Sequence, residues 1–161
     1  MKLPRLSVKD LLGMAARAEI DANKTYAKLA VRVGNPVLKE KFGLLSFEEK
    51  RHERTIRGFY KSLYEKDPIK IPKAADPALL PSVVVKPSSS LTDILFQAMG
   101  SEKSAQNFYA ALAERFRGEK KHVLEYLSNV ERGHYMMLRG EFTAALNFED
   151  YSEKDIDKVV T

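Results

Sequence analysis

A carboxylate and an imidazole stand in the middle of an apolar helical stripe, and this feature most limits how the chain can fold. Leu45, Glu49, His52, Ile56 and Phe59 are spaced four, three, four and three residues apart. That spacing puts all five on one face of a helix, the face that normally packs into a core. The fold must therefore place something in its interior that compensates these polar groups.

The second half of the chain repeats this pattern. A shift of 82 residues superimposes the Glu-x-x-His pair on a second such pair, and a shift of 83 superimposes an earlier glutamate on a later one. The principal matches are Glu19 with Glu102, Tyr26 with Tyr109, Glu49 with Glu131, and His52 with His134. Two copies of a helical hairpin indicate a pseudo-twofold axis through one bundle.

Capping and breaking residues predict four helices, over about residues 8–33, 36–65, 91–117 and, after Gly118, to about 146. Ser7 and Ser90 are N-cap candidates, and Pro36 suits a first helical turn. Residues 67–90 hold five prolines and cannot be helical throughout. The connections between successive predicted helices are short, long and short. This pattern predicts an all-α, ferritin-like four-helix bundle, with hairpins 8–65 and 91–146 joined by one long crossover. We expect one domain over 1–161, whose tail, 147–161, has room for one more short turn or helix.

Each predicted helix carries a glutamate on its core-facing seam, and two of them add a histidine three residues later. In a bundle these side chains meet in one central volume. Four buried carboxylates repel one another and lose hydration, so two divalent cations would balance their charge. A metal-free polar network is the alternative, but it requires six titratable groups to satisfy one another. The expected ligands are Glu19, Glu49, His52, Glu102, Glu131 and His134.

Other residues in these stripes have plainer interpretations. Tyr26 and Tyr109 lie seven residues after a seam glutamate, and we expect core packing with a hydrogen bond to a ligating carboxylate rather than a one-electron relay. Met136 and Met137 are expected to fill the core. His122 has a glutamate three residues before it, but on another face and with no counterpart in the first half, so we expect it at the surface.

Composition removes several classes of function. The chain has no cysteine, which excludes disulfides, iron–sulfur clusters and thiol nucleophiles within these residues. The net charge of +5 comes from basic residues scattered among acidic ones, so a nucleic-acid role is not expected. No apolar run approaches the roughly 20 residues that span a bilayer. Without a recognisable signal peptide, a cytoplasmic location is the expectation.

The segments AEIDANKTY, EEKRH, SEKSAQNFY and VERGH resemble the rubrerythrin family of the ferritin-like superfamily. The resemblance implies that Glu49 and Glu131 bridge two irons, with Glu19 and His52 completing one iron. It implies Glu102 and His134 for the other iron. Two differences stand out. Typical members carry a cysteine-ligated rubredoxin iron domain, and typical members have a further glutamate at the position of Ala105.

The resemblance implies a di-iron oxidoreductase that reduces hydrogen peroxide or dioxygen with electrons from an external donor protein. The family's redox-dependent iron movement uses the glutamate that Ala105 replaces. A ferroxidase or iron-binding protein, for which Fe(II) is the substrate, is the second hypothesis. A non-catalytic, metal-stabilised bundle is the third. Manganese, or a mixed metal pair, suits Glu and His ligands as well as iron does. A homodimer is plausible, and the long crossover would permit hairpins to be swapped between chains.

Overall fold

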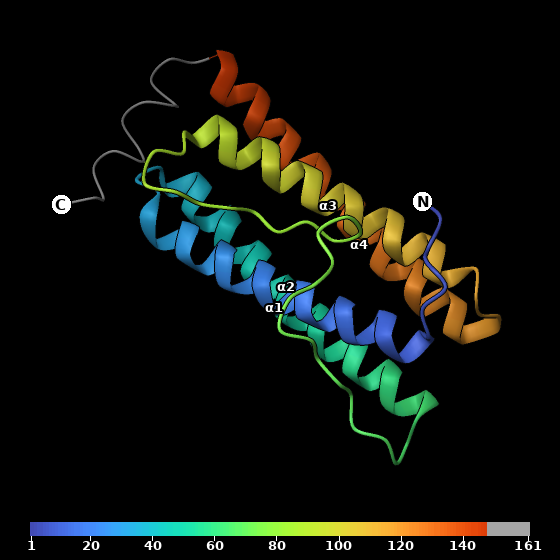
Figure 1. The fold of residues 1–161 in the computed structure, drawn as a ribbon. Coiled ribbons are helices and arrows are strands. Elements are labelled where there is room, and N and C mark those ends of the chain that lie inside the picture. The colour runs from blue at the N-terminus through green and yellow to red at the C-terminus, as the bar shows by residue number, and fades with distance from the viewer. Residues whose placement is uncertain (148–161) are drawn as a thin grey trace.

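The computed structural model describes residues 1–147, which form an all-α bundle (Figure 1). Helix α1 spans Val8–Arg32, α2 spans Pro36–Leu63, α3 spans Leu91–Ala113 and α4 spans Gly118–Asn147. The predicted helices are confirmed, although α3 ends about four residues earlier than the sequence suggested. The expected further turn in the tail lies outside the described residues.

Local capping explains where the helices begin. The Oγ atoms of Ser7 and Ser90 each accept a hydrogen bond at 3.1 Å from the backbone amide three residues later. Asn35 caps α2 by accepting from two amides of its first turn, where Pro36 has no amide to leave unpaired. Gly118 opens α4 with a φ of +58°, a conformation that glycine adopts without a steric penalty.

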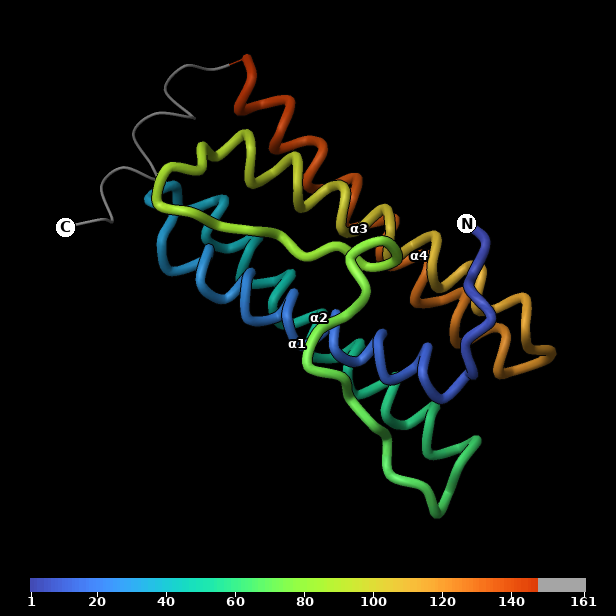
Figure 2. Tube along the Cα trace, viewed as in Figure 1, coloured from blue at the N-terminus to red at the C-terminus, as the bar shows by residue number. Residues whose placement is uncertain are grey.

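The helices form two antiparallel hairpins, α1–α2 and α3–α4, joined by the long segment between α2 and α3. This crossover runs back along the bundle over α1 and α3 (Figure 2), as the one-crossover topology requires. It lies close to α1 at Gly13, where an added Cβ would be 2.2 Å from the carbonyl oxygen of Lys70. Only glycine allows the crossover to lie against the helix at this point.

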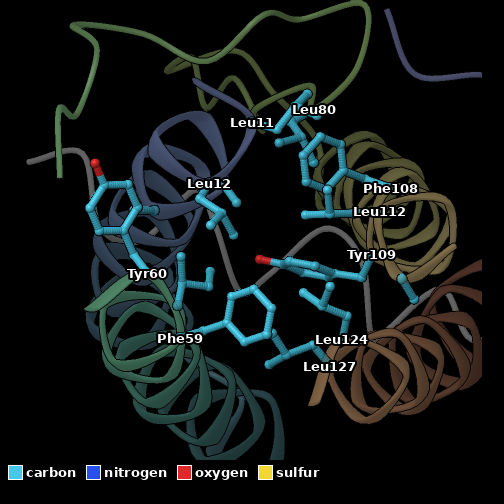
Figure 3. Packing of buried hydrophobic residues seen from close by; sticks show 14 of the residues in the cluster. Leu11, Leu12, Phe59, Tyr60, Leu80, Phe108, Tyr109, Leu112, Leu124 and Leu127 are labelled. Atoms are coloured by element: carbon cyan, nitrogen blue, oxygen red, sulfur yellow. The ribbon is translucent and has the colours of Figure 1, made fainter. Parts of the chain in front are cut away.

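Two apolar clusters fill the interior and leave a polar layer between them. One contains Leu12, Ile56, Leu112 and Leu124, and Leu80 of the crossover joins it beside α1 and α3 (Figure 3). The other contains Leu38, Leu45, Leu95 and Leu138. On every helix the seam glutamate lies between these two clusters in sequence. The polar layer is therefore shielded from water along the bundle axis in both directions.

The expectation for the two adjacent methionines is only half right. Met137 packs against the second apolar cluster, whereas Met136 is 51% exposed. Met136 lies two residues after His134, about 200° around the helix from that seam position, so it faces away from the core. Within residues 1–147, no helix combines the length and apolarity needed to cross a membrane.

Candidate metal centre

Six ionisable side chains meet in the polar layer at the middle of the bundle. α1 and α3 each contribute one glutamate, and α2 and α4 each contribute a glutamate and a histidine one turn apart. All are nearly inaccessible, the most exposed being His134 at 6%. They are Glu19, Glu49, His52, Glu102, Glu131 and His134, the set expected from the sequence. All six belong to the single chain described.

The two histidines have closely similar surroundings. Nδ1 of His52 lies 2.9 Å from Glu131, 3.3 Å from Glu49 and 3.6 Å from Glu19. Nδ1 of His134 lies 3.0 Å from Glu49, 3.2 Å from Glu131 and 3.5 Å from Glu102. The rings are stacked with centroids 5.4 Å apart. The Nδ1 atom of each histidine therefore faces three carboxylates, as the internal repeat predicts.

These contacts leave buried polar atoms without hydrogen-bond partners. They include Nδ1 of both histidines, both oxygens of Glu131 and Oε1 of Glu49. Unpaired buried polar atoms are costly, and most proteins avoid them. Here the unpaired nitrogens and oxygens face one another in one small volume, so they fit cations that coordinate them.

The ligand atoms fall into two overlapping groups, each spanning no more than 4.8 Å. Glu49 and Glu131 belong to both groups, and we call them the central carboxylates. Glu19 joins the group of His52, and Glu102 joins that of His134; we call these two the outer carboxylates. Each group holds three carboxylates and one imidazole. Two such groups sharing two carboxylates fit a dinuclear metal site.

The outer and the central carboxylates differ in how readily they hold a proton. Burial, followed by the negative charge of Glu49, raises the pKa of Glu19 to about 8. The same two causes raise the pKa of Glu102 well above its ordinary value. Burial would also raise the pKa of both central carboxylates. Hydrogen bonds outweigh it and lower both values, from Glu19 and the two histidines at Glu49 and from the two histidines at Glu131.

The histidines are affected in the opposite direction. Burial alone would lower the pKa of His52 and His134. The surrounding carboxylates outweigh burial and raise the pKa of both rings, with Glu131 the largest contributor at His52 and Glu102 at His134. In the absence of metal, both imidazoles therefore hold a proton where a cation would otherwise lie.

Two tyrosines connect the outer carboxylates to the opposite hairpin. The hydroxyl of Tyr26 on α1 donates to Oε1 of Glu102 on α3, and that of Tyr109 on α3 donates to Oε1 of Glu19 on α1. Figure 3 shows the Tyr109 hydroxyl directed toward the middle of the bundle. The hydrogen bonds expected from the sequence are present, and each crosses between hairpins.

The third Glu-x-x-His pair lies at the surface, as expected. The side chain of His122 is 75% exposed and contacts Glu125 instead of Glu119. Glu48 is not among the expected ligands, yet its carboxylate oxygen lies within 4.8 Å of a ring nitrogen of both His52 and His134. Its position four residues before the histidine, on an adjacent part of the same helix face, was the available signal.

Comparisons with known proteins agree with this arrangement. The family model for rubrerythrin matches residues 10–150, which include every member of the metal centre. A solved structure described as a hypothetical protein from Pyrococcus furiosus is 38% identical, with a TM-score of 0.77. That match covers 88% of this chain and 92% of the other. A comparison with curated proteins finds no match. The fold and the buried carboxylate–histidine site agree with the family match, and this chain belongs to the rubrerythrin family.

Proposed function

We propose that the metal centre holds two iron ions and reduces hydrogen peroxide or dioxygen with electrons from an external donor protein. The observation that supports this most is the pair of overlapping ligand groups with unpaired atoms in a dry interior. Glu19 and His52 would hold one ion and Glu102 and His134 the other. The central carboxylates, being common to both groups, would bridge them. Manganese, or a mixed pair, is the alternative occupant of the same ligands.

The metals, when bound, supply two electrons at one place, which is the number that one peroxide needs. The balance is H₂O₂ + 2 e⁻ + 2 H⁺ → 2 H₂O. The two electrons must be returned after each turnover. No cysteine is available within these 161 residues to hold a rubredoxin-type iron. We therefore propose that a redox centre outside these residues delivers them.

The side chains around the ligands prepare the centre for this role. Burial and the charge of Glu102 raise the pKa of Tyr26 well above its ordinary value, and burial and Glu19 do the same for Tyr109. Both phenols therefore stay protonated and act as donors, which fixes the orientation of the outer carboxylates. The apolar clusters on both sides exclude water from the axis of the bundle. Reactive species at the centre are thereby separated from most of the protein surface.

One observation favours ferroxidase or iron-binding activity as the second candidate. Residue 105, one helical turn after Glu102, is alanine, so this position adds no seventh ligand. The family resemblance links a glutamate here to iron movement during peroxide turnover. A centre without it would bind Fe(II) as a substrate, pass its electrons to peroxide or dioxygen, and release the Fe(III) product.

Elemental analysis and peroxide titration test these proposals. Protein purified without chelators should contain about two iron atoms per chain, and Glu49→Gln should lower this content whereas Glu119→Gln should not. Fe(II)-loaded protein is then mixed with peroxide, with and without an added reductant. Rapid multiple turnovers that depend on the reductant support the oxidoreductase. Stoichiometric iron oxidation with accumulating product supports the ferroxidase, and an unchanged spectrum refutes both in favour of a structural metal site.

A further inference from the structure

A small cavity lies against the metal centre on the side of α1 and α3. Its inner end is formed by the four carboxylates of the centre. Its outer end is formed by residues 80–83 of the crossover. The cavity volume is about 30 Å³, which is room for roughly two water-sized molecules. A molecule that approaches the centre from this side must therefore pass the crossover.

The crossover is fixed over this cavity by two side chains of α3. Oγ of Ser101 donates to the carbonyl oxygen of Pro81 at 2.8 Å. Oε1 of Gln97, one turn earlier, accepts from the amide of Val84 at 3.0 Å. On the other side Leu80 is 5% exposed and belongs to an apolar cluster. The segment is thus held on both flanks of the cavity and forms its outer wall.

The side walls are made of small residues. Ala18 and Ala22 line the cavity from α1, and Ala105 lines it from α3. Ala105 lies one turn after Glu102 and so next to an outer carboxylate. A longer side chain at this position would fill the space in which a small molecule meets the centre. The volume of the cavity is therefore set by Ala105 and by the fixed crossover.

We infer that this cavity is a size filter, with Ala105 and residues 80–83 as its specificity-determining walls. It admits molecules of two or three heavy atoms, such as hydrogen peroxide, dioxygen or azide, and excludes alkyl and aryl hydroperoxides. The choice of peroxide and dioxygen as substrates rests on the proposed function. The filter itself follows from the cavity and its walls.

The test uses the metal-loaded full chain with azide as a small probe. Azide binding is measured from the spectrum of the oxidised iron centre. Ala105→Leu should weaken it by about tenfold, because the added carbons occupy the cavity. Ala110→Leu, on the exposed face of the same helix, is the matched control and should bind azide as the parent does. If Ala105→Leu fails to fold or to take up two metals, Ala105→Val is measured instead. Unchanged azide affinity in a folded, loaded variant overturns the inference.

A second variant tests the crossover. Ser101→Ala combined with Gln97→Ala removes both attachments and should raise the rate with cumene hydroperoxide relative to hydrogen peroxide about tenfold. Equal rates for both peroxides in the parent protein overturn the size filter while leaving the oxidoreductase intact. Azide binding that depends on Ala105, without peroxide turnover, refutes the proposed function and supports the filter.

Discussion

Loading the metal-free protein with two divalent ions should release about four protons per chain at pH 7. Both histidines have raised pKa values, so each ring holds a proton that must leave before Nδ1 can bind metal. The outer carboxylates also have raised pKa values, that of Glu19 reaching about 8. These four groups lose one proton each. Four positive charges depart and four arrive with the metals, so the interior stays neutral in both states.

Isothermal titration with Zn²⁺ in buffers of different ionisation enthalpy measures this number directly. Four released protons also mean that the overall association constant for both ions rises about 10⁴-fold per pH unit near neutrality. Glu19→Gln removes one of the four protons and should release three, because the amide has none to lose. Glu119→Gln, at the surface, should still release four. Release of no protons, with an affinity indifferent to pH, would show that the metal-free site is already ionised and refute the charge argument.

Three further predictions concern stability and are measured by thermal denaturation. Tyr26→Phe or Tyr109→Phe should each cost about 1–3 kcal/mol, since a buried carboxylate oxygen loses its donor; an unchanged melting temperature would contradict the crossed hydrogen bonds. Gly13→Ala should cost about 1–3 kcal/mol, because its Cβ meets the carbonyl of Lys70, whereas Gly43→Ala meets nothing within 4 Å and should be neutral or better. The metal-free protein should become less stable as pH rises from 6.5 to 8. The histidines and outer carboxylates have raised pKa values when folded, so their contribution is complete only below their unfolded pKa values and declines above them. The metal-loaded protein should lack this decline, and a parallel decline in both forms would count against the assigned protonation states.

The seam spacing was sufficient to predict which side chains meet in the core. Steps of three and four residues fix the buried face of a helix, so Glu49 and His52 had to point inward once a bundle formed. The repeat then identified Glu131 and His134 independently. The crossover was also predictable, because five prolines in residues 67–90 exclude a continuous helix.

The sequence could not predict contacts that depend on how the two hairpins are docked. Tyr26 lies about 10 Å along the helix from Glu19, too far to bond it, and its actual partner, Glu102, is fixed only by tertiary packing. The cavity beneath residues 80–83 likewise depends on the path of a non-helical segment, for which the sequence has no periodicity. Met136 was misplaced because it lies about 200° around α4 from the seam position of His134, on the exposed side.

The fusion of two similar hairpins into one polypeptide has a consequence for the ions themselves. Each half provides one outer carboxylate and one Glu-x-x-His pair, so a symmetric association of two identical hairpins would supply the same donor set. In a single chain, however, a substitution in one half is not copied into the other. Glu48 on α2 and its ion-pair partner Arg51 have Val130 and Gly133 as counterparts on α4, so one half alone places this ion pair near the imidazoles. Covalent linkage thus lets the two halves of the site diverge independently, which identical subunits could not do.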